Sequence, residues 1–178
     1  MKHVVVAWME DKPGVLARVA GLFRRRGFNI ESLVVGHSET SGISRMTFVV
    51  DGDDRVMHQV ESQLAKLINV TALEDVTAMP VVVREMALIK VSAEGGEKRT
   101  EILQMAEVFR AKIVDVGHNA LTLEVTGEQD KVDSLIGLLR RFGIQELSRT
   151  GQVAMVRAAA RENGNGHRSE SSSYGEST

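Results

Sequence analysis

The sequence contains no cysteine, which excludes disulfides, thiolate nucleophiles and cysteine-based zinc sites. The absence of cysteine is consistent with a protein from a reducing compartment. No run of about 18 apolar residues is present, and the N-terminus lacks the charged-then-apolar layout of a signal peptide, so neither a membrane span nor export is expected. The cytoplasm is therefore the expected location.

Aromatic residues make up only 4% of the chain and the formal net charge is -2, which disfavours a nucleic-acid partner. An RNA-binding module is still an alternative, because it shares the βαββαβ order derived below and because Arg24 to Arg26 are basic. The third predicted strand, however, carries Met46 and Phe48 without the paired aromatic residues that stack bases. The arginines are better explained as complementing a helix dipole.

An enzyme is a second alternative. The five histidines show no metal-ligand spacing and have no cysteine partner, so we predict no metal site and no catalytic residue. The acidic segment "DGDD" at residues 51–54 is more typical of a turn followed by a helix start than of a metal site.

The first half of the chain alternates between extended and helical patterns. Residues 2–9 form a β-branched apolar run, typical of a strand buried on both faces. From Val15 apolar residues recur at helical spacing until Gly27, which follows three arginines and marks the helix end. Residues 28–36 and 43–50 predict a hairpin, a helix carries Val56, Val60, Leu64, Leu67 and Ile68, and residues 70–77 return as a strand.

The same order recurs after Pro80. We predict strands at 86–92, 113–116, 120–126, 144–148 and 153–156, with helices at 99–110 and 129–141. The fold class is therefore α+β, with two tandem ferredoxin-like βαββαβ domains whose antiparallel sheets carry helices on one face. We place the first domain at 1–78 and the second at 79–160. Residues 161–178 are polar without an apolar period, which predicts a disordered tail.

The turn "DKPGVL" at residues 11–16 precedes the first predicted helix. We place Pro13 at the first helical position, where its missing N–H costs no hydrogen bond, and Gly14 leaves no Cβ above the exposed amides. These amides and the helix dipole suit a small anion such as a carboxylate. Asp11 could face an ammonium group, so the turn can take both ends of a free α-amino acid.

Asn29 opens the second predicted strand, and we expect it to lie beside the first strand and the turn, where its amide can bridge ligand and loop. The neighbouring Ile30, Leu33 and Val35 are aliphatic and would favour a branched apolar effector. The alternative is purely structural, because Pro-Gly commonly introduces helices and asparagine commonly caps or turns.

The second strand lies on the outside of a sheet of ferredoxin-like order. "NIESLVVG" has one acidic residue, no lysine and no proline to protect that edge. We therefore expect it to pair with a second copy of itself through Ile30, Leu33 and Val35, giving a homodimer with a continuous sheet. The turn of one chain would then lie near the second strand of the other.

The segment "DKPGVLARVAGLFRRRGFNIESL" resembles an ACT domain, and more narrowly the small regulatory subunit of acetolactate synthase, also called acetohydroxyacid synthase. The blocks "SRMTFVVDGDD", "QVESQLAKLINV", "REMALIKV", "EVFRAKIVDVG", "LTLEVTG" and "SRTGQVAMVRA" extend the likeness over nearly all of residues 2–158. The pair "RGFNIESL" and "SRMT" is specific, whereas "PGVL" alone is common to the ACT domains of many enzymes.

This resemblance implies a subunit without catalytic residues or cofactors of its own. Such a subunit activates a separate catalytic subunit, which converts pyruvate to acetolactate in valine, isoleucine and leucine biosynthesis, and it imposes feedback inhibition by valine. Thiamine diphosphate, magnesium and an optional FAD are expected only on that catalytic partner. The alternative is an ACT-domain amino-acid sensor that serves a different enzyme or acts alone, but the downstream blocks argue against it.

The family's valine contacts fall on Asp11, Gly14 and Asn29 here, and we extend the predicted effector site to the adjacent Val15, Leu16 and Ile30. Several family members have asparagine where this chain has Asp11. The contact with the amino group of the effector would therefore become an ion pair.

Overall fold

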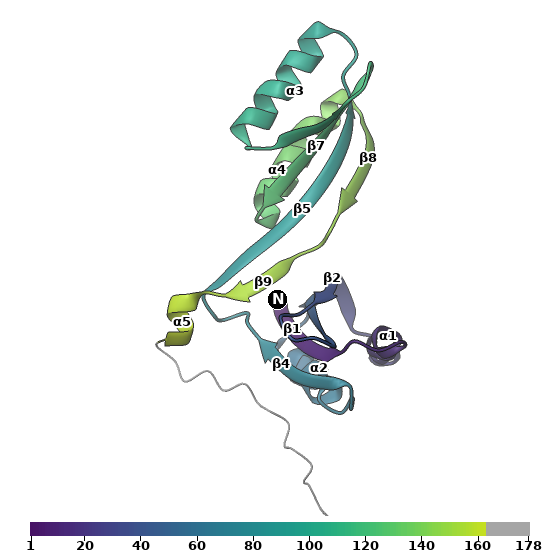
Figure 1. Ribbon diagram of the computed structural model, residues 1–178, viewed down its shortest axis with the longest axis vertical. Helices are drawn as coiled ribbons and strands as arrows, with labels where there is room; N and C mark the ends of the chain where they lie inside the picture. Colours follow the sequence, from purple (N-terminus) through teal and green to yellow (C-terminus); the bar gives the residue numbers. More distant parts are fainter. Residues whose placement is uncertain (163–178) are drawn as a thin grey trace, which may run out of the picture. The chain divides into compact units, whose positions relative to one another are not determined.

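The computed structural model describes residues 1–162 of the chain, which form two compact units (Figure 1). The first unit comprises Met1–Val82 together with the described residues from Ala154 onward, and the second comprises Val83–Val153. Each unit is built on an antiparallel sheet with two helices.

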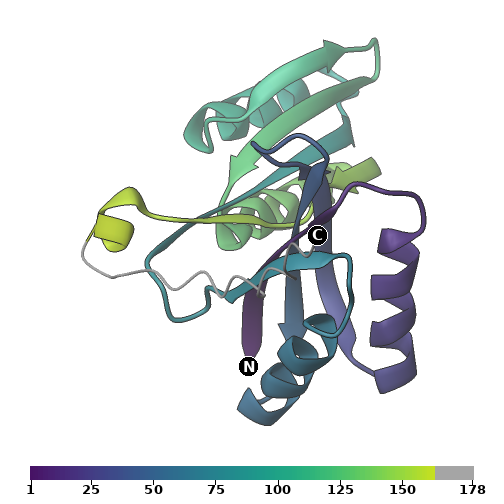
Figure 2. The same ribbon diagram turned by 60° about the horizontal axis from the view of Figure 1, so that its bottom comes forward.

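The first unit has the predicted βαββαβ order. Its sheet has the strand order β2-β3-β1-β4, so β2 is an edge strand as expected. The helices α1 and α2 contribute their buried residues to one core cluster with alternate residues of the strands, which places both helices on one face (Figure 2). The elements are β1 (Lys2–Glu10), α1 (Val15–Arg26), β2 (Asn29–His37), β3 (Ile43–Asp51), α2 (Asp54–Leu64) and β4 (Val70–Asp75).

The helix α1 forms because its apolar residues lie on one face and its end is well capped. Val15, Val19, Leu22 and Phe23 are buried. Gly27 takes a left-handed conformation with φ 68°, and its N–H points back to the carbonyls of the last turn. The stop signal read from the sequence is confirmed.

The helix α2 begins as "DGDD" predicts. The carboxylate of Asp53 accepts a hydrogen bond of 2.8 Å from the N–H of Val56 and so caps the helix. The predicted helical stripe is too long at its other end, because α2 stops at Leu64 and the chain turns tightly there, with the N–H of Leu67 donating to the carbonyl of Leu64. Leu67 packs on the core from this turn, whereas Ile68 is exposed.

The strand β1 is buried on both faces, as its continuous apolar run predicts. Val5, Ala7 and Met9 belong to the core under the helices, while Val6 and Trp8 on the opposite face are also buried. Phe48 of β3 packs edge-on against Phe23 of α1 with the ring centroids 5.4 Å apart. This packing fixes α1, and hence the turn before it, against the sheet.

The second unit repeats the topology, with the strand order β6-β7-β5-β8, and β9 also pairs with β5. The fold class predicted from the sequence, two tandem ferredoxin-like units of the α+β class, is confirmed. The elements are β5 (Val81–Ser92), α3 (Gly96–Val108), β6 (Lys112–Val116), β7 (Ala120–Gly127), α4 (Gln129–Leu139), the 3-10 helix η1 (Arg140–Phe142) and β8 (Ile144–Arg149). The strand β9 (Val153–Val156) follows, and its residues from Ala154 onward are in the first unit.

The last described element is α5 (Ala158–Glu162). It includes the first two residues of the segment 161–178 that the composition predicts to be a disordered tail. The remainder of that segment lies outside the described residues.

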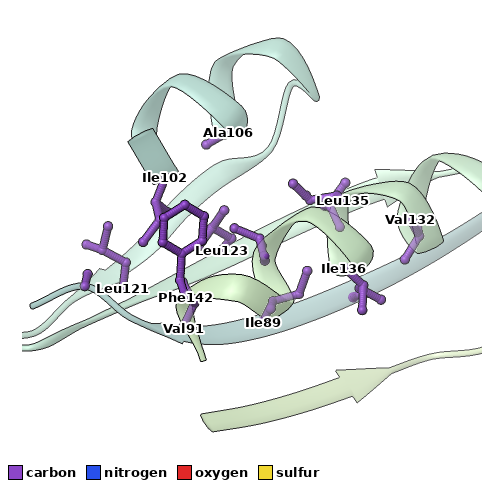
Figure 3. Packing of buried hydrophobic residues seen from close by; sticks show 14 residues of the cluster. Ile89, Val91, Ile102, Ala106, Leu121, Leu123, Val132, Leu135, Ile136 and Phe142 are labelled. Atoms are coloured by element: carbon purple, nitrogen blue, oxygen red, sulfur yellow. The ribbon is translucent and has the colours of Figure 1, made fainter. Parts of the chain in front are cut away.

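The core of the second unit lies between its sheet and the helices α3 and α4 (Figure 3). Leu135 of α4 is fully buried there together with Leu123 of β7 and Ile89 of β5. Replacing Leu135→Ala should lower the free energy of unfolding by about 2 to 5 kcal/mol, because the substitution leaves a cavity that the packed neighbours cannot fill. Urea denaturation followed by circular dichroism measures the change.

The matched control is Leu138→Ala on the same helix. Leu138 is 45% exposed, so its truncation should change the free energy of unfolding by only about 0.5 kcal/mol. Equal losses for the two variants would contradict the position of this core.

Candidate functional site

The turn between β1 and α1 is held at both of its ends. The N–H of Asp11 donates to the carbonyl of Gly42 in the β2–β3 hairpin at 2.8 Å, and the N–H of Val15 donates to the carbonyl of Lys12 at 3.3 Å. The sequence predicts Pro13 at the first helical position. The helix instead begins at Val15, so Pro13 lies in the turn before it. The reason is that Gly14 takes a left-handed conformation with φ 85°, which lets the chain turn once more before the helix starts.

The start of α1 offers free backbone donors. No side chain within residues 1–162 caps this helix end. The first helical hydrogen bond runs from the N–H of Arg18 to the carbonyl of Gly14, so the N–H groups of Leu16 and Ala17 have no acceptor within the helix. A Cβ built on Gly14 would meet nothing within 4 Å, so the approach to these amides is open. The geometry suits a small anion at the positive end of the helix dipole.

Two adjacent carboxylates lie at this end of β1, and they differ in their partners. Glu10 accepts hydrogen bonds from Lys12 and from Asn69, and these bonds, the one from Lys12 first, lower the pKa of its carboxyl. Asp11 is 46% exposed, and its Oδ2 lies 3.2 Å from Nδ1 of His37 at the end of β2. Asp11 is therefore the carboxylate of this pair that faces outward and can meet a cation.

Asn29 lies at the other end of the sheet, which corrects the expectation that one chain brings it beside the turn. It pairs with Asp51 of β3, and Asp51 pairs in turn with Lys2 at the beginning of β1. The turn follows Glu10, whose partner is Ile43. Asn29 and His37 are separated by the whole of β2, roughly 25 Å of extended chain. Because β3 lies between β1 and β2, the start of β2 cannot adjoin the end of β1.

The other predicted effector residues are divided in the same way. Val15 is buried in the core and Leu16 is half-exposed beside Gly14, whereas Ile30 lies next to Asn29 at the far end and packs against the core. A single chain thus brings Asp11, Gly14, Val15 and Leu16 together, and it leaves Asn29 and Ile30 apart from them.

The edge strand β2 exposes apolar side chains along its length. Leu33 is 36% and Val35 is 42% exposed, although their cross-strand neighbours Phe48 and Met46 are fully buried. The acidic residue of this strand, Glu31, forms an ion pair of 2.8 Å with Lys2. Among the described strands β2 pairs with β3 alone. Its outer side therefore carries unpaired backbone groups with little charge to keep another strand away.

The second unit repeats the turn without the carboxylate of Asp11. The N–H of Ala93 donates to the carbonyl of Asn119 at 2.9 Å, as the N–H of Asp11 does to Gly42, and Gly95 caps α3 with φ 85°. Ala93 is buried and apolar where the first unit has Asp11. The second unit therefore has no carboxylate at the position of Asp11, and the carboxylate of its turn is that of the next residue, Glu94.

Residues 1–162 hold no group of three or more histidine, cysteine, aspartate or glutamate side chains that could bind a metal ion. No helix within these residues is long and apolar enough to cross a membrane.

Comparisons with known proteins agree for both units. The family model described as "AHAS small subunit-like ACT domain" matches residues 6–72, and the model "Small subunit of acetolactate synthase" matches residues 84–158. The chain is 56% identical over 157 residues to the probable acetolactate synthase small subunit of Archaeoglobus fulgidus, covering 88% of this chain and 98% of that protein. The corresponding protein of Methanothermobacter thermautotrophicus is 53% identical, with 88% and 94% covered.

A solved structure shows the same fold. The crystal structure of the acetolactate synthase small subunit from Thermotoga maritima superposes with a TM-score of 0.82 at 44% identity, covering 88% of this chain and 98% of that one. The two family models together span both structural units, and the relatives are matched over nearly their whole length. The chain therefore belongs to the acetolactate synthase small-subunit family.

Proposed function

We propose that this subunit activates the catalytic large subunit of acetolactate synthase and makes it sensitive to feedback inhibition by valine, in the synthesis of valine, isoleucine and leucine. The observation that carries the proposal is the open turn Asp11–Leu16 at the start of α1, in a chain whose two units both match the small-subunit family. The reaction and its cofactors, thiamine diphosphate, magnesium and an optional FAD, then belong to the large subunit.

The effector site that we propose is completed by a second copy of the chain. If β2 pairs antiparallel with β2 of a partner, the start of the partner strand lies beside the end of this one. The partner's Asn29 then reaches the end of the sheet where Asp11, Gly14 and His37 lie. The exposed Leu33 and Val35 and the unpaired edge support this pairing, because it would bury both.

Each part of valine has a partner in this arrangement. The carboxylate would accept hydrogen bonds from the N–H groups of Leu16 and Ala17 at the positive end of α1. The ammonium group would face the carboxylate of Asp11, and the partner's Asn29 would supply an amide that can donate and accept. The isopropyl group would contact Leu16 and the partner's Ile30, whose aliphatic side chains favour a branched apolar ligand.

The activating role is tested by mixing the purified subunit with a purified acetolactate synthase large subunit and measuring acetolactate formation. We expect a severalfold rise in rate with the subunit and a return toward the unassisted rate when valine is added, since valine can act only through the small subunit in this proposal. No change in rate at saturating subunit would contradict the activating role. A rise that valine leaves unchanged would contradict the inhibitory role alone.

A further inference from the structure

His37 is the one histidine in the described chain that lies against the proposed effector turn. It ends β2, and its Nδ1 is 3.2 Å from Oδ2 of Asp11. The hairpin keeps the two residues together, because the N–H of Ser38 donates to Ile43 and the N–H of Asp11 donates to Gly42. In the sequence His37 is one of five histidines without metal-ligand spacing. The antiparallel register, which sets the end of β2 beside the end of β1 across β3, reveals its position.

The other charged residues near this pair are carboxylates, a lysine and an arginine. Glu10 and Lys12 bond to each other, and Glu39 lies two residues beyond His37 in the hairpin. Arg45, opposite Gly36, donates to the carbonyl of Ala154. Carboxylates, lysine and arginine titrate far from neutrality, so among these groups the imidazole alone changes charge between about pH 5.5 and 8.

We propose that His37 is a positioning residue of the effector site that competes with the ammonium group of the amino acid for the carboxylate of Asp11. The proposal rests on the effector site described under the proposed function. A protonated imidazole pairs with Asp11 and repels the incoming ammonium group. A neutral imidazole leaves the full negative charge of Asp11 to the effector.

The direction of the pH dependence follows from this competition. Valine remains a zwitterion, with both of its groups charged, across this range. As the pH falls, His37 gains a proton and the effector binds more weakly. By linkage, the binding of valine releases protons at any pH where His37 is partly protonated.

Titration calorimetry with valine tests the proposal on the full chain. We expect the wild type to bind valine about two to five times more weakly at pH 5.5 than at pH 8.0, which is the size of effect that one exposed ion pair gives. His37→Gln should bind equally at both pH values, close to the wild-type affinity at pH 8.0. Repeating the titration at pH 6.5 in two buffers of different ionisation enthalpy should show proton release for the wild type and none for His37→Gln.

The matched control is His118→Gln, which changes a histidine in the corresponding hairpin of the second unit. The backbone carbonyl of His118 accepts a hydrogen bond from Arg99, and the substitution keeps this carbonyl. This variant should keep the wild-type pH dependence. Equal wild-type affinity at both pH values, or an unchanged dependence in His37→Gln, would overturn the role of His37 and leave the effector site standing. No heat of binding at either pH would overturn the effector site itself, and the role of His37 with it.

Discussion

Replacing Gly14→Asp is expected to abolish inhibition by valine and to weaken valine binding at least about a hundredfold. The new carboxylate would stand beside the N–H groups of Leu16 and Ala17, where the carboxylate of valine has to bind, and such a juxtaposition of like charges costs several kcal/mol. The chain should still fold, because a Cβ at Gly14 meets nothing within 4 Å. Aspartate also tolerates the left-handed conformation better than most residues do. Calorimetry and the valine dependence of acetolactate formation measure the two effects.

Gly95→Asp is the matched control. Gly95 also caps a helix, has the same φ of 85° and has no atom within 4 Å of an added Cβ, but it lies in the second unit beside the buried Ala93. Because ψ is 154° at Gly95 and -8° at Gly14, Gly95 lies outside the left-handed region, so this variant should carry at least the backbone strain of Gly14→Asp and still keep valine inhibition. Undiminished inhibition in Gly14→Asp, or equal loss in both variants, would reject the turn as the effector site.

Mixing two inactive variants is expected to restore valine binding. Gly14→Asp removes the anion site and Asn29→Ala removes the amide, so neither homodimer has an intact site. When equal amounts are mixed and the chains exchange, half of the dimers are mixed, and each of these has one intact site and one doubly altered site. About a quarter of all sites should then bind valine.

The result is diagnostic because one chain holds the two residues at opposite ends of its sheet, with Gly14 in the turn after β1 and Asn29 at the start of β2. If a site were built within one chain, no mixture of these variants could restore it. The control is the double variant Gly14→Asp/Asn29→Ala mixed with wild type. Its mixed dimers have no intact site, so exchange should lower the intact fraction from a half to about a quarter, which the wild-type homodimers keep. Calorimetric stoichiometry measures the intact fraction, and a fraction near zero after mixing the two single variants would refute the shared site.

The sequence itself carries much of the fold. Apolar residues at helical spacing from Val15 to Phe23 bury one face of α1, and Gly27 ends the helix, because these are local properties of the chain. The order of predicted strands and helices is that of a ferredoxin-like sheet, and in such a sheet the second strand lies at an edge, as β2 does. The end of α2 was misplaced because Leu67 reaches the core from a turn, and a periodic pattern does not distinguish a turn residue that packs inward from a helical one.

The sequence by itself determined which residue types are present at the turn and at the start of β2, and so it was enough to predict Asp11, Gly14 and Asn29 as effector residues from their chemistry. Only the tertiary structure decided which of them meet. The antiparallel sheet places β3 between β1 and β2, so Asn29 lies at the far end of the sheet from the turn, while His37, at the other end of the same strand, lies beside Asp11. Strand register depends on residues far apart in the sequence, so the sequence pattern near Asn29 could not show at which end of the sheet Asn29 lies.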